Sequence, residues 1–168
     1  MDAVIETRAL HKHFGDIRAV DGVDMAVRPG EIYGLLGPNG SGKTTLIRLL
    51  VGMLRATEGS ATVLGRVVPD KSLLSDIGYM TQSAALYEDL TVRENVGFFA
   101  EMCGGVPRGR VDEVIALVNL DDRGNSVIRT LSCGMRQRAS LACGLLHRPR
   151  PLPLEEPTVG GERQLRAT

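Results

Sequence analysis

The sequence predicts an α/β fold in which strands and helices alternate and a helical segment is inserted. Three observations predict it. A glycine-rich loop at 37–45 stands between a short apolar strand and a segment that can run as a helix. The residues before the loop alternate between apolar and polar side chains, which is typical of half-buried strands. Between about 85 and 130 the apolar residues recur with a helical period instead.

The first half of the chain is predicted to be mainly strands. Alternation predicts strands over 3–14 and 19–27, and a turn at 28–30 leads into a strand over 31–36. A helix over 44–51 follows the glycine-rich loop, and shorter strands are expected over 60–64 and 77–80. This order, strand then glycine loop then helix, is the setting in which such a loop binds phosphate.

The second half is predicted to be mainly helical. Thr91 and Glu94 form a capping-box pattern, and 95–103 continues as a helix. The segment 111–120 has one apolar helical face, and Ser132 is the expected N-cap of a third helix over 135–147. Prolines end that helix, and a strand is expected over 152–156.

Composition limits the classes of function. A length of 168 residues fits about one domain, and an apolar content of 43% is enough for a folded core. The 20 basic and 20 acidic residues cancel, so nucleic acid is not an expected partner. Cys103, Cys133 and Cys143 lack metal-ligand spacing and fit a reducing compartment. No apolar run approaches the length of a membrane span, and no signal peptide is visible.

The glycine-rich loop carries the clearest chemistry. It reads G-x-x-x-x-G-K-T, and its residues are Gly37, Pro38, Asn39, Gly40, Ser41, Gly42, Lys43, Thr44 and Thr45. Backbone N–H groups of the loop and of the following helix can point at a phosphate. Lys43 adds an ammonium for the β- and γ-phosphates, and the Thr44 hydroxyl can ligate Mg²⁺. The alternative is a glycine-rich turn that happens to precede Lys-Thr.

A second constellation supports a family resemblance. Leu-Ser-Cys-Gly-Met at 131–135 opens the third helix, and Leu-Glu-Glu-Pro-Thr follows at 154–158. With the loop at 37–45, this order resembles the ATP-binding subunit of an ABC transporter over residues 3–161. The resemblance implies a P-loop NTPase core with an antiparallel β subdomain and an inserted helical subdomain. Within a single ATP-binding domain, the β subdomain and the P-loop core are expected over 1–84 and the helical subdomain with the signature loop over 85–134. The signature helix, a degenerate acidic strand and a tail are expected over 135–168.

The resemblance also implies nucleotide contacts. Phe14 matches the aromatic residue that stacks on adenine, although it is also a plausible apolar strand end. Ser132, Cys133 and Gly134 match the signature loop, which in this family covers the γ-phosphate of ATP held by the other subunit. A helix N-terminus suits that role because it offers N–H groups to an anion.

Catalytic and metal roles are implied in the same way. Glu156 matches the general base that polarises the attacking water. Gln82 matches the glutamine that contacts Mg²⁺ and that water. Glu155 stands where the family has a Mg²⁺-associated aspartate. Without the resemblance, Gln82 would be an ordinary loop residue and the acidic pair a solvated charge cluster.

ATP and Mg²⁺ are therefore the expected cofactors. The expected partners are a second ATP-binding subunit and a transmembrane permease subunit, which would place the chain on the cytoplasmic face of the cell membrane. The segment 83–95 resembles the region that docks on the permease. The residues of this segment are most similar to those of exporters of drugs, antibiotics or ions. The transported substrate is selected by subunits outside this sequence.

Four departures from the family pattern bear on activity. Cys133 replaces a signature glycine, where a Cβ is expected to strain the backbone or clash with phosphate. Glu155 is one methylene longer than aspartate, and positioning governs phosphoryl transfer. Pro151 and Pro153 fall in an expected core strand. No histidine lies beyond His147, and the last core elements of the family are missing.

These departures leave two functions open. One is an ATP-hydrolysing transporter subunit, with hydrolysis impaired. The other is a truncated or decayed, non-enzymatic remnant that binds nucleotide weakly or not at all. A small kinase or GTPase is disfavoured, because the signature and acidic motifs follow the loop and no Asn-Lys-x-Asp occurs.

Overall fold

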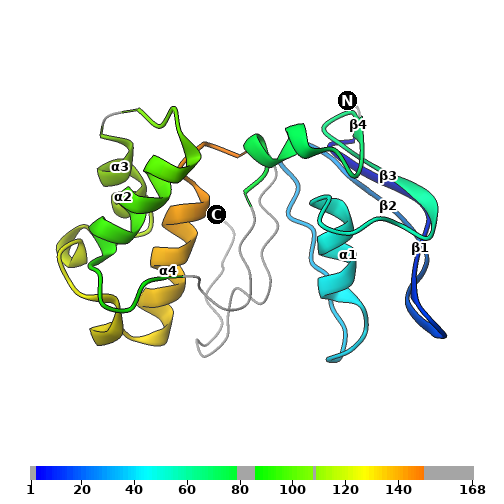
Figure 1. Ribbon diagram of the computed structural model, residues 1–168, viewed down its shortest axis with the longest axis horizontal. Helices are drawn as coiled ribbons and strands as arrows, with labels where there is room; N and C mark the ends of the chain where they lie inside the picture. The colour runs from blue at the N-terminus through cyan, green and yellow to red at the C-terminus, as the bar shows by residue number, and fades with distance from the viewer. Residues whose placement is uncertain (1–2, 79–85, 108, 150–168) are drawn as a thin grey trace. The chain divides into compact units, whose positions relative to one another are not determined.

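The computed structural model describes residues 3–78, 86–107 and 109–149 (Figure 1). The chain divides into two compact units, Met1–Ile77 and Gly78–Thr168. The first contains an antiparallel sheet and helix α1, and the second contains helices α2, α3 and α4. An α/β fold is thereby confirmed. The acidic-pair strand expected over 152–156 lies outside the described residues.

The sheet of the first unit has four antiparallel strands in the order β2-β1-β3-β4. Their bounds are β1 Ile5–Phe14, β2 Ile17–Val27, β3 Glu58–Val63 and β4 Arg66–Val67. The strands expected near 3–14, 19–27 and 60–64 are confirmed. β1 and β2 form a long ribbon whose register shifts three times between Thr7 and His13. Such irregularities bend a ribbon and re-aim its side chains.

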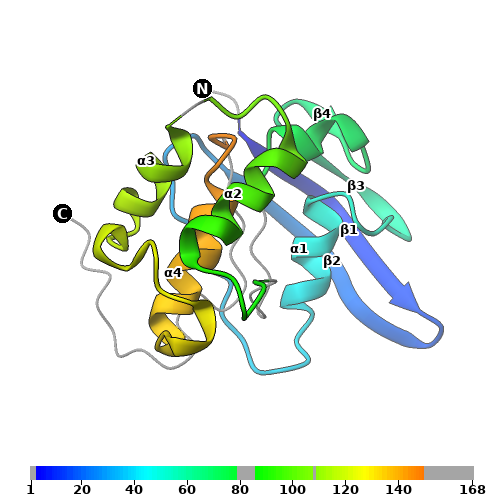
Figure 2. The same ribbon diagram turned by 60° about the vertical axis from the view of Figure 1, so that its left-hand side comes forward.

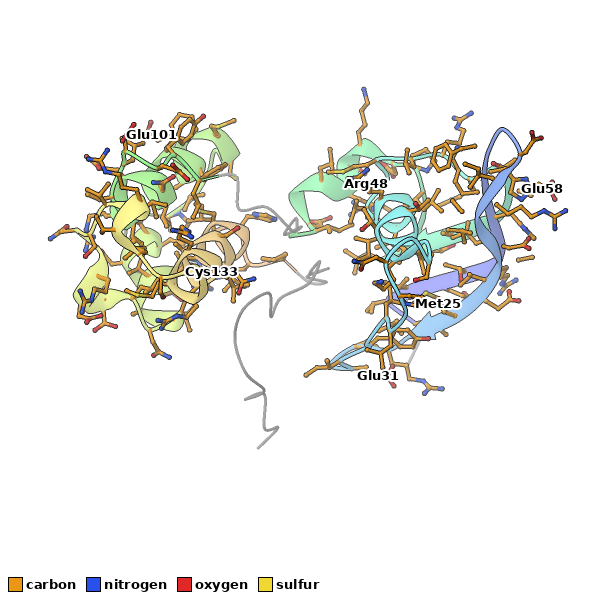
Figure 3. The ribbon with its side chains drawn as sticks, turned by 90° about the horizontal axis from the view of Figure 1, so that it is seen from below. Met25, Glu31, Arg48, Glu58, Glu101 and Cys133 are labelled. Carbon is orange, nitrogen blue, oxygen red and sulfur yellow. The ribbon has the colours of Figure 1, made fainter. Side chains whose placement is uncertain are left out.

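Helix α1, Lys43–Leu50, lies against this sheet (Figures 1 and 2). It buries one apolar stripe, formed by Leu46, Ile47, Leu49 and Leu50, while Arg48 stays exposed on the opposite side (Figure 3). The spacing of these residues is that of an amphipathic helix. The helix expected over 44–51 is confirmed, and its packing determines where the glycine-rich loop ends.

The strand expected over 31–36 does not form. The segment has no ladder partner among the described residues, and the side chains of Ile32 and Leu36 are almost fully exposed, at 98% and 96%. Ile77 and Gly78, at the start of the strand expected over 77–80, are irregular, and 79–80 lie outside the described residues. The prediction of a strand over 31–36 was wrong, because a strand requires a paired backbone as well as an apolar pattern.

The second unit is built from α2, Val92–Cys103, α3, Arg110–Leu117, and α4, Cys133–Gly144, which pack on one another (Figure 2). Their buried residues form one core that includes Val96, Ile115 and Ala139. The capping box is confirmed: Thr91 Oγ1 accepts the Glu94 N–H, and the Glu94 carboxylate accepts the Thr91 N–H. The helix expected over 111–120 is confirmed but ends earlier.

Two buried polar side chains stabilise this unit. Asn95 accepts the Tyr87 N–H at 2.8 Å and donates to the carbonyls of Tyr87 and Thr91, at 3.0 and 2.9 Å. Arg110 donates to the carbonyls of Leu145 and Leu146, at 2.6 and 3.1 Å. Asn95 therefore holds the loop before α2, and Arg110 binds two carbonyl groups directly after the end of α4.

Candidate functional site

The glycine-rich loop approaches other atoms closely at two of its glycines. Gly42 is the N-cap of α1 and has a φ of 86°. A Cβ on Gly42 would lie 2.0 Å from the carbonyl oxygen of Ala19 in β2, and one on Gly37 would lie 2.7 Å from Ser41 Oγ. A side chain is therefore excluded at Gly42, where it would meet fixed backbone, whereas at Gly37 it would meet only the Ser41 side chain, whose hydroxyl can rotate. The start of α1 is packed directly on the sheet.

The N-terminus of α1 differs from those of the other described α-helices. α2 is capped by Thr91 and α4 by Ser132, while α3 carries Asp112 and Glu113 in its first turn. α1 has neither a capping side chain nor an acidic residue in its first turn. Its first N–H groups and its positive dipole end are consequently available to an external anion.

Lys43 lies at the mouth of the loop. Its Nζ donates to the carbonyl oxygens of Gly37 and Pro38, at 2.7 and 2.9 Å. The loop is also closed by the Ser41 N–H, which donates to Pro38 O at 3.2 Å. Lys43 is the first residue of α1, and these bonds hold its ammonium against the backbone of the loop, where it adds positive charge. Thr44 and Thr45 follow in the first turn and are half-buried. The arrangement fits a phosphate chain bound by backbone N–H groups and one ammonium.

Phe14 stands at the end of β1 and is 48% exposed. The Nζ of Lys12 lies 5.0 Å from the centroid of its ring, a cation–π geometry. Strand β2 links this position to the glycine-rich loop, because Ile17 pairs with Phe14 and the Ala19 carbonyl meets Gly42. Lys12 and Ala19 were both missed from the sequence. The two-residue spacing on one strand could have pointed to Lys12, whereas no sequence signal points to the Ala19 carbonyl.

The signature segment lies at the start of α4. Ser132 is the N-cap, as predicted, and its Oγ accepts the Met135 N–H at 3.3 Å. Cys133 is exposed at the first turn (Figure 3) and is not among the described residues with positive φ. The backbone strain expected there was therefore wrong, because a helical first turn accepts a Cβ. A Cβ on Gly134 would meet nothing within 4 Å. Whether Cys133 clashes with a phosphate stays a prediction about the assembled site.

Three predicted site residues lie outside the described part of the chain. They are Gln82, Glu155 and Glu156. The general base and two of the predicted Mg²⁺ contacts therefore stay predictions from the sequence. Of the predicted metal contacts, Thr44 lies within the described residues.

The comparisons with known proteins decide the family. The ABC transporter family model matches residues 20–159. This chain belongs to the ABC transporter family. It is 38% identical over 172 residues to the Bacillus subtilis "Uncharacterized ABC transporter ATP-binding protein YhcH", covering 99% of this chain. It is 40% identical over 164 residues to the Escherichia coli "Probable multidrug ABC transporter ATP-binding protein YbhF", covering 95%. It is 38% identical over 162 residues to the Bacillus licheniformis "Bacitracin transport ATP-binding protein BcrA", again covering 95%.

Solved structures agree. The structure of cbiO1 from Clostridium perfringens, described as part of the ABC transporter complex cbiONQ, matches with a TM-score of 0.87 at 26% identity, covering 96% of this chain and 68% of that one. The ADP conformation of MJ1267, an ATP-binding cassette, matches with a TM-score of 0.83 at 25% identity, covering 96% and 72%. The ABC ATP-binding cassette fold is thus established for this chain.

This chain spans only part of the length of the curated relatives that it matches. It covers 56% of YhcH, 28% of YbhF and 53% of BcrA. In the described part of the chain, none of the helices combines the length and the apolar character that a membrane span requires.

Proposed function

We propose that this ABC chain binds ATP with Mg²⁺ at the loop 37–45 and couples ATP binding and hydrolysis to transport by a membrane permease. One observation carries the binding step. The N-terminus of α1 has no capping side chain, is packed on the sheet at Gly42, and begins with Lys43, whose ammonium binds the backbone of the loop. An anion with several oxygens satisfies all of these groups at once.

The roles of the remaining residues follow the family pattern. Thr44, Gln82 and Glu155 ligate or orient Mg²⁺, and Glu156 activates water as the general base. Phe14 stacks on the adenine. The segment 132–134 covers ATP held by a second ATP-binding subunit, so each ATP site is shared between two chains.

The names of relatives support the proposed substrate class. YbhF is named for multidrug transport, BcrA for bacitracin transport and LnrL of Bacillus subtilis for linearmycin resistance. A Cupriavidus pinatubonensis relative is named for Nod factor export, and the cbiO1 structure is described as part of a transporter complex, which supports export and a permease partner. The proposed substrate is a drug, an antibiotic or, as the sequence pattern also allows, an ion. The partner would hold this chain at the cytoplasmic face of the cell membrane.

A second candidate function is nucleotide binding without turnover, or weak binding by a non-enzymatic remnant. The observation that favours it is the segment before the loop. Segment 31–36 pairs with no strand among the described residues and Ile32 and Leu36 are exposed, whereas the Gly42 end of the loop contacts the Ala19 carbonyl. Phosphoryl transfer requires more exact positioning of the loop than nucleotide binding does.

The first experiment measures binding of a fluorescent ATP analogue with Mg²⁺ to the whole chain and to Lys43→Ala. Losing one charged hydrogen-bond donor to phosphate should weaken binding about tenfold or more. Lys71→Ala is the matched control, because Lys71 is exposed in the same unit and starts the short helix η1, Lys71–Ser75. Equal binding by both variants, or no binding by the wild type, would contradict the nucleotide site.

The second experiment measures phosphate release with Mg·ATP beside a Glu156→Gln variant. Turnover that disappears in the variant supports the hydrolysing subunit. If the wild type binds ATP but releases phosphate no faster than Glu156→Gln, the second candidate is supported.

A further inference from the structure

We propose that the β1–β2 ribbon binds a divalent transition-metal ion, represented by Zn²⁺, through His11, His13 and Asp21. None of the three belongs to the proposed ATP site, and the inference does not rest on that function. Figure 1 draws this ribbon in blue, with the two strands joined by a tight turn. The ion would tie β1 to β2 immediately before Phe14.

The three side chains already converge. One ligand atom from each lies within 4.8 Å of the others. His11 Nδ1 is 3.1 Å from Asp21 Oδ1, and the ring centroids of His11 and His13 are 5.9 Å apart. Around a tetrahedral Zn²⁺ with bonds of about 2.0–2.1 Å, donor atoms lie about 3.3 Å apart. The ligand atoms therefore have to approach one another by at most about 1.5 Å to reach that geometry.

The backbone holds the ligands in this arrangement. His11 and His13 are two residues apart on β1, so their side chains leave the same face of the strand. Thr57 fixes both: its N–H donates to the His11 carbonyl at 2.9 Å, and its Oγ1 accepts the His13 N–H at 3.0 Å. Asp21 projects from the neighbouring strand β2. Glu58 lies opposite His11 in the β1–β3 register.

An independent observation points to a ligand. The Nε2 atom of His13 is buried and has no hydrogen-bond partner among the described residues. A buried ring nitrogen without a partner is unfavourable, since it has given up its bond to water. A metal ion accepts the lone pair of such a nitrogen. The same ion would replace the proton that His11 Nδ1 shares with Asp21.

The donor set selects the class of ion. Two imidazoles and one carboxylate suit Zn²⁺, Cu²⁺ or Ni²⁺, whereas Mg²⁺ and Ca²⁺ prefer oxygen ligands. Three protein ligands leave one tetrahedral position for water. Arg18 opposes binding, because its Nη1 lies 3.5 Å from Asp21 Oδ2 and competes for that carboxylate. The donor set, with its two imidazoles, also distinguishes this site from the Mg²⁺ site proposed at Thr44.

Equilibrium dialysis of the whole chain against ZnCl₂ tests the proposal. The wild type should bind one ion, and His11→Gln, His13→Gln and Asp21→Asn should each weaken binding by at least about tenfold. Asp16→Asn is the matched control, since Asp16 is an exposed acid in the turn of the same ribbon and should leave binding unchanged. Circular dichroism confirms that each variant is folded.

A gain of affinity provides a test that misfolding cannot imitate. Arg18→Gln removes the competing cation and should tighten Zn²⁺ binding, whereas Arg28→Gln, which makes the same charge change beside Glu31, should not. Co²⁺ in place of Zn²⁺ should give a nitrogen–oxygen spectrum without a thiolate charge-transfer band. Absence of Zn²⁺ binding, a thiolate band, or undiminished binding by all three ligand variants would overturn the site.

Discussion

Replacing Gly42 by alanine tests the contact between the nucleotide loop and the sheet. The added Cβ would lie 2.0 Å from the Ala19 carbonyl oxygen, so backbone must move by about 1 Å to reach a tolerable separation. Alanine at a φ of 86° costs about 1–2 kcal/mol, and relieving the overlap costs about 1–3 kcal/mol more. We therefore expect Gly42→Ala to lower the free energy of unfolding by about 2–5 kcal/mol.

Gly30→Ala is the matched control. Gly30 has a nearly equal φ of 80°, but a Cβ there meets nothing within 4 Å and lies outside the loop. Gly30→Ala should lower the free energy of unfolding only by the cost of alanine at a positive φ, about 1–2 kcal/mol, and should leave ATP binding unchanged. Gly42→Ala should weaken ATP binding as well, because it displaces the first turn of α1.

Urea unfolding followed by circular dichroism measures the two free energies, and hydrogen exchange of the α1 amides localises the effect to the first unit. Equal losses of stability for Gly42→Ala and Gly30→Ala would contradict this prediction. That result would mean that the start of α1 does not press on β2.

Three further predictions concern the helical unit. Arg110→Met should destabilise it by about 3 kcal/mol in urea unfolding, because carbonyl groups at the end of α4 lose a charged donor; an unchanged midpoint would contradict this. Asn95→Ala should cost about 2 kcal/mol and raise hydrogen exchange at Tyr87, whose N–H loses its acceptor, and protection that persists at Tyr87 would argue against it. Burial, and secondarily the charge of Cys103, raise the pKa of Cys143 to about 12 from an ordinary 9.0. The Cys143 thiol should therefore resist iodoacetamide at pH 8 while the exposed Cys133 reacts, and mass spectrometry measures the two alkylation yields. The contribution of Cys143 to stability should be present below pH 9 and be lost as the pH rises toward 12. Equal alkylation of Cys143 and Cys133 would refute that prediction.

Local signals in the sequence predicted much of the fold. The capping box at Thr91 and the N-cap at Ser132 were identified correctly because each depends on residues within one helical turn. The first two strands were found because alternation on a ribbon with one buried face is visible in the residue order. The same logic failed over 31–36, because pairing depends on strands elsewhere in the chain.

The candidate nucleotide site was predicted from one continuous motif, and the structure adds what supports it. The motif named Lys43 and Thr44, but not the contact of Gly42 with Ala19 or the position of Lys12 over Phe14. The proposed metal site was not predicted at all. It depends on a ribbon whose register shifts between Leu10 and His13, and such shifts are not encoded in any short pattern.

Residue types at short, regular spacings were enough to predict the family, the glycine-rich loop and the N-caps at Thr91 and Ser132. Only the folded chain shows that α1 lacks a capping side chain and packs on the sheet, and that the segment 31–36 is unpaired among the described residues. The convergence of His11, His13 and Asp21 is likewise visible only in the fold. The physical reason is the range of the interactions. Backbone propensity and capping act within a few residues, whereas close contacts, strand pairing and clustered ligands require segments far apart in the chain to meet.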